Sequence, residues 1–133
     1  MQRAHPAIAV VVAAALASFV GAFVAACSPP QAEGSPADRF AKDPAAVKRG
    51  KGIFVGTCAA YCHSLKKDNR DAPYLFDCEW LHGGTDAEIH NTIVNGVPNT
   101  RMVGFGNTFP QGDDDVWRVV AFLKSNREAC PKP

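Results

Sequence analysis

The chain has 133 residues and an almost balanced charge, with 14 lysine and arginine residues against 13 aspartate and glutamate residues. This length suits one folded domain with additional segments. Because the charges do not produce a strong basic field, the composition argues against a protein that is recruited to nucleic acid by charge.

The first 26 residues have the pattern of a secretory signal. A short polar start with Arg3 and His5 precedes an almost unbroken apolar run over residues 8–24, and small residues follow. We therefore expect residues 1–26 to be removed on export, which leaves 107 residues with 13 basic and 13 acidic side chains. The apolar run is close to the roughly 20 residues that a membrane span requires, so an uncleaved anchor is the alternative.

Cys27 follows the apolar run directly. The tetrapeptide Val24-Ala25-Ala26-Cys27 resembles the lipobox of bacterial lipoproteins, in which the cysteine is acylated and becomes the new N-terminus. The resemblance implies lipidation at Cys27 and a domain held at the periplasmic side of a bacterial membrane without spanning it. A soluble exported protein with a spare cysteine is the alternative.

Residues 27–42 contain several proline and serine residues and few large apolar ones, and we expect them to form a flexible tether. The folded domain is expected over residues 43–133. Asp43 is a good N-cap and Pro44 suits the first helical position, so a helix is predicted from there to about residue 55. Gly50 lies on the same face as Phe54, and its missing side chain predicts a close crossing by another helix.

The next stretch is Cys58-Ala59-Ala60-Tyr61-Cys62-His63. Two cysteines followed directly by a histidine are the pattern for covalent attachment of a c-type haem. Each thiol can form a thioether with a haem vinyl group, and the histidine beside the second anchor can become the proximal iron ligand. The usual pattern has two residues between the cysteines, and this chain has three.

A polar segment, expected to be a surface loop, follows the motif and leads to Pro73, ten residues after His63. A backbone carbonyl here can accept a hydrogen bond from the second ring nitrogen of His63, which would orient the ring and raise its basicity. The turn-rich segment 78–84 carries Trp80 and His82.

Two more helices are expected in the second half of the chain. Thr85 and Glu88 fit a capping box that starts one helix, and the pair Asn95-Gly96 fits its end. A loop rich in glycine and proline, residues 97–112, contains Met102. The last helix should cover about residues 113–127, because three aspartates begin it and an apolar stripe follows. We expect these aspartates to start the helix and do nothing more. No alternating strand pattern is present, so the predicted fold is all-α.

Taken together, these features resemble the class I cytochrome c family over about residues 44–127. The shared features are the spacing of Gly50 and Phe54 before Cys58, the haem motif, a proline about ten residues after the histidine, a methionine in a Gly/Pro-rich loop, and a final helix with the aromatic residues Trp117 and Phe122. The third residue between the cysteines departs from the family pattern, and single-cysteine attachment is the alternative if the longer loop cannot bulge.

The resemblance implies a small fold of three to five helices around one covalently bound haem c. It implies His63 and Met102 as the axial ligands, and a crossing of the first and last helices at Gly50 and Phe122. The implied function is one-electron transfer, without enzymatic activity, between redox proteins such as a periplasmic dehydrogenase, an oxidase or another cytochrome. A histidine–methionine pair favours a fairly high reduction potential.

Two residues near the implied haem have two interpretations each. Trp80 can donate its indole N–H to a haem propionate, or it can cover the haem while the N–H finds another acceptor. Arg101 can pair with a propionate, or it can lie in solvent at a docking face.

Cys78 and Cys130 are left after the lipobox and the haem motif are assigned. Disulfides persist in exported proteins, so a bridge between these two cysteines is the simplest pairing. Two free thiols are the alternative.

Other interpretations of the same residues remain open. His82 and His90 are the rivals of Met102 for the sixth position, and Met102 itself can be ordinary packing. An open or histidine-ligated sixth site would suit a haem sensor or a peroxidase-like protein. In a non-haem protein, Cys58, Cys62 and His63 could bind zinc or the cysteines could form a disulfide, although adjacent Cys62 and His63 are awkward for one tetrahedral ion.

Overall fold

The structure is a computed structural model, and it describes residues 34–129 except Asn107. The predicted signal segment 1–26, the proposed lipidation site Cys27 and the predicted disulfide partner Cys130 therefore lie outside the described residues, and these three expectations stay predictions.

The described chain is helical, as predicted. Its helices are α1 (Pro36–Ala41), α2 (Pro44–Ile53), the π-helical turn η1 (Phe54–Cys58), α3 (Asp86–Asn95) and α4 (Asp113–Asn126). Within these residues the only β-type pairing is an isolated bridge between Gly96 and Val103. In the same part of the chain, no helix is both long enough and apolar enough to cross a bilayer.

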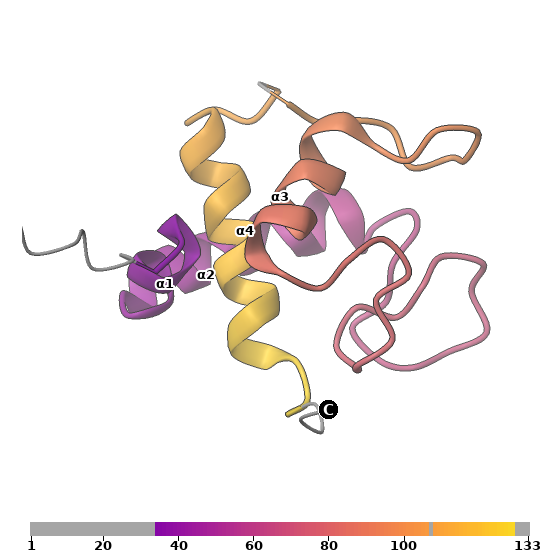
Figure 1. Cartoon of the computed structure of the whole chain (residues 1–133), viewed down its shortest axis with the longest axis horizontal. Coiled ribbons are helices and arrows are strands. Elements are labelled where there is room, and N and C mark those ends of the chain that lie inside the picture. The colour runs from indigo at the N-terminus through magenta and orange to yellow at the C-terminus, as the bar shows by residue number, and fades with distance from the viewer. Residues whose placement is uncertain (1–33, 107, 130–133) are drawn as a thin grey trace, which may run out of the picture. The chain divides into compact units, whose positions relative to one another are not determined.

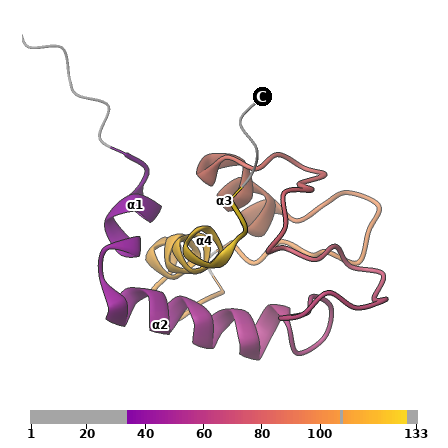
Figure 2. The same cartoon turned by 90° about the horizontal axis from the view of Figure 1, so that it is seen from below.

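Helix α4 lies in the middle of the domain (Figure 1). It packs against α2, α1 and α3. Figure 2, in which α4 is seen almost end-on, shows α2 passing along one side of α4 and the long loops gathered on the side away from α1. The chain thus forms a helical framework of α1, α2 and α4, and a side made of α3 and the loops 59–85 and 96–112.

Helices α2 and α4 cross closely at Gly50, as predicted. A Cβ atom on this residue would lie 2.0 Å from the backbone oxygen of Arg118 and 3.1 Å from the nitrogen of Val119. The family resemblance implied a crossing at Phe122. The crossing point on α4 is instead at Arg118, one helical turn before Phe122. Phe122 instead packs on Phe54, with ring centroids 5.5 Å apart. Only a glycine permits this approach of the two backbones.

The helix ends follow the capping signals of the sequence. The Asp43 carboxylate accepts a hydrogen bond from the backbone N–H of Ala45 at 2.9 Å. Thr85 and Glu88 form the complete capping box. Gly96 ends α3 with a φ of 72°, a conformation that favours glycine.

Residues 36–41 correct the prediction of a flexible tether up to residue 42. They form α1, and Ala37 is fully buried against the rest of the domain. The Lys124 ammonium lies 2.7 Å from both Asp38 on α1 and Asp86 on α3. Ser35 and Pro36 are a helix-start signal that the surrounding proline and serine residues obscured. The folded unit thus begins before Asp43.

Asp115 is the buried polar centre of the framework and was not expected from the sequence. Its side chain has no solvent exposure and accepts hydrogen bonds from Arg49 at 2.6 and 2.8 Å and from Arg118 at 2.9 Å. The backbone N–H of Gln111 adds a contact at 3.0 Å. The Arg49 hydrogen bonds hold the pKa of Asp115 at about 2, below its ordinary value of 3.8. This aspartate joins α2 to α4 and does more than start a helix.

Candidate haem-binding site

A cavity of about 360 Å³ opens between α3 and the long loops. Its lining is largely apolar and includes Leu75, Ile89, Ile93 and Leu123, together with His63 and Met102. A second hollow of similar volume shares Cys62, His63, Arg101 and Met102 with the first. The two spaces are therefore neighbouring parts of one crevice, and His63 and Met102 line both of them.

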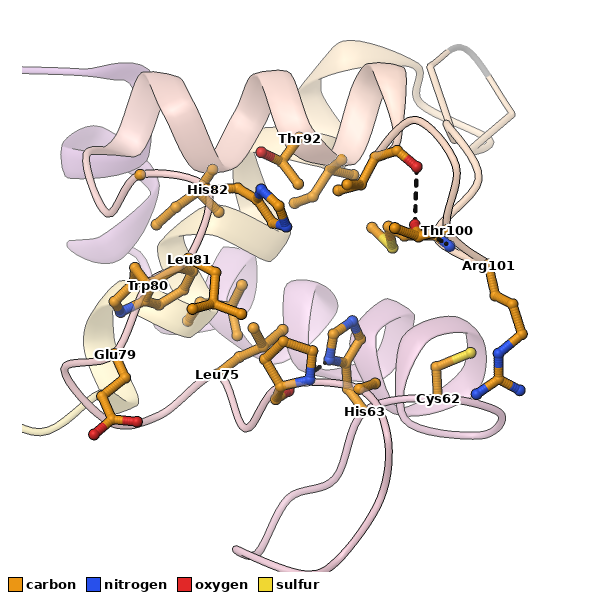
Figure 3. A pocket seen from close by; sticks show the side chains of 18 of the residues that line it. Cys62, His63, Leu75, Glu79, Trp80, Leu81, His82, Thr92, Thr100 and Arg101 are labelled. Atoms are coloured by element: carbon orange, nitrogen blue, oxygen red, sulfur yellow. Dashed lines mark hydrogen bonds between the residues drawn. The ribbon is translucent and has the colours of Figure 1, made fainter.

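His63 is held in a fixed orientation at the wall of this crevice. Only 8% of the residue is exposed, and its Nδ1 atom lies 2.8 Å from the carbonyl oxygen of Pro73. This is the contact anticipated from the sequence. A carbonyl only accepts, so Nδ1 carries the proton and Nε2 keeps a lone pair for a metal ion. Figure 3 shows the His63 ring projecting into the cavity.

A hydrogen-bonded turn that directly follows the π-helical turn η1 accommodates the three residues between the two cysteines. The backbone N–H of Ala59 bonds to the oxygen of Phe54 at 2.8 Å, and the N–H of Cys62 bonds to the oxygen of Cys58 at 3.1 Å. The chain thus continues as a helical turn through the motif. Residues four apart lie on the same side of such a turn, and both cysteines line the second hollow. The extra residue therefore leaves both thiols at the crevice.

The two thiols are free and are not joined to each other. Burial raises the pKa of the Cys58 thiol to about 11, and the nearby Cys62 adds to this shift as a like charge. Cys58 is therefore a neutral thiol at neutral pH. The structure therefore does not contain the alternative disulfide between Cys58 and Cys62.

Arg70 stabilises the backbone of the haem-attachment motif by hydrogen bonds. This role was not predicted from the sequence. Its guanidinium donates to the backbone oxygens of His63 at 2.9 Å and of Ala59 at 3.2 Å. It also pairs with Asp68 at 3.1 Å. A basic residue in a polar loop gave no sign of this role, because its partners are backbone atoms of another segment.

Met102 also lines both spaces. Its loop, residues 96–112, is attached to α3 by backbone hydrogen bonds: Phe105 N–H to Ile93 O at 2.8 Å and Gly106 N–H to Val94 O at 3.2 Å. The Met102 oxygen itself accepts from the N–H of Val97 at 2.9 Å. The loop therefore presents the thioether from a fixed backbone.

The two rival histidines have different surroundings. His82 lines the cavity, and Figure 3 shows its ring projecting inward from the loop opposite His63. His90 does not line it. The ring of His90 stacks on Trp117, with centroids 4.0 Å apart. The structure thus leaves Met102 and His82, but not His90, at the crevice.

Trp80 and Arg101 both line the crevice and have protein partners in this structure. The indole N–H of Trp80 donates to the backbone oxygen of Asp77 at 3.1 Å, which favours a covering role over a propionate contact. Arg101 pairs with Asp71 at 2.5 Å, and both side chains are largely exposed. This ion pair links the two rims of the crevice. Arg127, which donates to the oxygen of Gly84 at 2.8 Å, supports the loop that carries Trp80.

The residues of the crevice fit a covalently attached haem. The set comprises two thiols, an imidazole with a free nitrogen, a thioether and an apolar lining, which are the groups that hold haem c in proteins. Among residues 34–129 without Asn107, no three His, Cys, Asp or Glu side chains converge as a metal-ion cluster.

Comparison with known proteins agrees with this assignment. Residues 45–123 match the family described as cytochrome c oxidase, cbb3-type, subunit III. The chain belongs to this family. It is a c-type cytochrome domain, as the resemblance to cytochromes c implied, and this supports covalently bound haem and electron transfer.

Several curated relatives are oxidase subunits. The chain is 42% identical over 62 residues to the cbb3-type cytochrome c oxidase subunit CcoP of Rubrivivax gelatinosus, which covers 46% of this chain and 20% of that protein. It is 32% identical over 91 residues to subunit CcoP of Azospirillum sp. (strain B510) and 31% over 90 residues to subunit FixP of Azorhizobium caulinodans, covering 60% and 62% of this chain and 30% of each protein. The chain thus spans less than a third of these relatives. No solved structure matches it.

Proposed function

We propose that this chain is a monohaem electron carrier, and not itself an enzyme, with His63 and Met102 as the axial ligands. The observation that carries the proposal is the crevice in which His63, with its free Nε2, and Met102 line the same two spaces. Bound haem supplies a reversible one-electron iron couple. The chain's own residues orient the ligands and surround the group with an apolar lining.

Covalent attachment is assigned to both Cys58 and Cys62. The helical turn between them, with its hydrogen bond from Cys62 N–H to Cys58 O at 3.1 Å, supports two thioethers despite the longer spacing. The chain has one such motif, so we propose one haem. Mass spectrometry of the haem peptide, compared with Cys58→Ser and Cys62→Ser, tests this. Attachment in wild type that survives either change unaltered would contradict the double linkage.

The partners are proposed to be larger redox proteins at the periplasmic side of a bacterial membrane. The relatives named as cbb3-type oxidase subunits support an oxidase as one such partner, with a periplasmic dehydrogenase or another cytochrome as the other. We propose a lipid anchor at Cys27 to hold the domain there. Mass spectrometry of the processed N-terminus tests the anchor, since an unmodified Cys27 would exclude it.

The function is tested by expressing the full chain together with haem-attachment machinery. The purified protein should show a covalent c-type spectrum, change reversibly on reduction and reoxidation, and fail to bind carbon monoxide when reduced. A protein with no covalent haem would contradict the proposal.

His82 supports a second candidate, because it also lines the cavity. If His82 is the sixth ligand or the site is open, the protein is a haem sensor or peroxidase-like protein instead. Rapid binding of carbon monoxide by the wild type would favour an open site. A bis-histidine spectrum that changes in His82→Ala would favour His82.

A further inference from the structure

Three side chains form a closed cluster where α3 meets the start of α4. The Asp113 carboxylate lies 2.6 Å from Nε2 of His90 and accepts from the indole N–H of Trp117 at 2.8 Å. The rings of His90 and Trp117 stack with centroids 4.0 Å apart and an angle of 18°. Because a carboxylate only accepts, both rings donate to Asp113. We call these three residues the clasp.

The clasp joins the two ends of the loop that carries Met102. His90 is on α3, which leads into the loop, and Asp113 is the first residue of α4, which receives it. The loop is fixed to α3 by the N–H groups of Phe105 and Gly106. The clasp fixes its other end, since Asp113 is tied to α3 through His90.

None of the three clasp residues lines the crevice. Asp113 is 61% exposed and His90 is 19% exposed as side chains, so the clasp lies at the surface and away from the cavity. These residues cannot be iron ligands in this arrangement. Any effect that they have on the site must act through the loop.

We propose that the clasp positions Met102, keeping its loop closed over the crevice so that the thioether stays at the sixth position. This inference rests on the proposed His63–Met102 ligation. The clasp contacts exist only when the start of α4 lies against α3, so they favour the closed loop over an open one. A small external ligand must displace Met102, and its apparent affinity therefore rises with the fraction of open loop.

A second contact between the same two helices provides a matched control. Lys124 near the end of α4 pairs with Asp86 at the start of α3 and with Asp38 on α1, each at 2.7 Å. It is also a polar contact between helices, but it is far along both helices from the Met102 loop. Lys124→Ala should destabilise the domain without opening the loop.

The test compares wild type, His90→Ala, Trp117→Phe and Lys124→Ala as full-length haem proteins. Imidazole is titrated into each ferric protein, and the near-infrared methionine–iron band is recorded. Trp117→Phe keeps an aromatic ring against His90 but removes the N–H donor together with part of the ring surface, so it decides the question if His90→Ala does not fold. Unfolding in urea gives the stability of each variant.

We expect both clasp variants to bind imidazole about tenfold more tightly and to lose the methionine–iron band at lower imidazole concentration, whereas Lys124→Ala should stay within about twofold of wild type. Equal effects in the control and the clasp variants would overturn the inference, because general destabilisation would then explain them. Unchanged affinity in the clasp variants would also overturn it while leaving Met102 ligation intact. A wild type without the band would overturn the proposed ligation itself and the clasp role with it.

Discussion

The helical framework and the crevice side of this domain are built differently. In the framework, α2 and α4 touch backbone to backbone at Gly50, and a fully buried Asp115 on α4 joins them through Arg49 of α2. On the crevice side, the loops are fastened by a few hydrogen bonds, such as those of Arg70 and of Val97 with Met102. Changes in the framework should therefore appear in the free energy of unfolding, and changes on the crevice side in the haem spectrum.

The largest effect is expected for Gly50→Val. A Cβ atom here would lie 2.0 Å from the Arg118 oxygen, so the helices must separate. We expect a loss of at least about 3 kcal/mol in unfolding free energy, measured by urea denaturation. Gly52→Ala is the matched control, because nothing lies within 4 Å of its added Cβ. It should raise stability by up to about 1 kcal/mol, and a similar loss in both variants would contradict the close crossing.

Asp115→Asn should be next, because it leaves Arg49 and Arg118 without their buried partner. We expect a loss of about 3 kcal/mol in urea denaturation. The neighbouring Asp114 provides the control: it is 59% exposed and lies 3.6 Å from Arg118, so Asp114→Asn should change the unfolding free energy by less than about 0.5 kcal/mol.

Asp115 should also shape the acid stability of the domain. Hydrogen bonds, first from Arg49, lower its pKa to about 2 from an ordinary 3.8. As the pH falls, Asp115 is protonated in the unfolded chain before it is protonated in the folded one. The stabilisation that the Asp115 carboxylate gives the folded state is therefore complete above pH 3.8 and is lost as the pH falls to about 2. Asp115→Asn should flatten the unfolding free energy over this window. An identical slope in wild type and variant would contradict this.

Arg70→Ala should disturb the crevice more than the fold. The guanidinium holds two carbonyls of the attachment motif, so its loss should cost about 1 kcal/mol and shift the reduction potential and visible spectrum. Lys67→Ala is the control, since it has one exposed contact, at 3.4 Å with Asp77. An unchanged spectrum in Arg70→Ala would show that these two hydrogen bonds do not affect the haem site.

Thr85→Ala should lower the unfolding free energy by about 1 kcal/mol, about as much as Arg70→Ala, because it removes the cap of α3. Thr85→Ser retains the hydroxyl and should restore most of the loss. A full loss in both variants would show that the methyl group, and not the cap, is responsible.

The sequence predicted the features that depend on neighbours along the chain. Asp43, Thr85 and Gly96 mark helix ends because their contacts are only a few residues away. Gly50 was identified because a glycine inside a helix has a propensity cost that suggests a packing reason. The haem motif follows from the spacing of its cysteines and histidine, whereas the role of Met102 was implied by the family resemblance.

The features that were missed depend on contacts between distant segments. Arg49 is 66 residues from Asp115, and Lys124 is 86 residues from Asp38 on α1. A run of three aspartates does not show which of them is buried. Asp115 is buried, whereas Asp113 accepts hydrogen bonds from the side chains of His90 and Trp117. The π-helical turn was also missed, because it arises where the end of α2 runs directly into the haem motif.

The account is tested most directly by the near-infrared spectrum of the ferric haem protein in wild type, Met102→Ala and His82→Ala. We predict a methionine–iron band in wild type and in His82→Ala. The band should be absent in Met102→Ala, and that variant should bind carbon monoxide when reduced. A wild type without the band, or a Met102→Ala variant that retains the wild-type spectrum, would contradict the assignment of His63 and Met102 as the ligand pair.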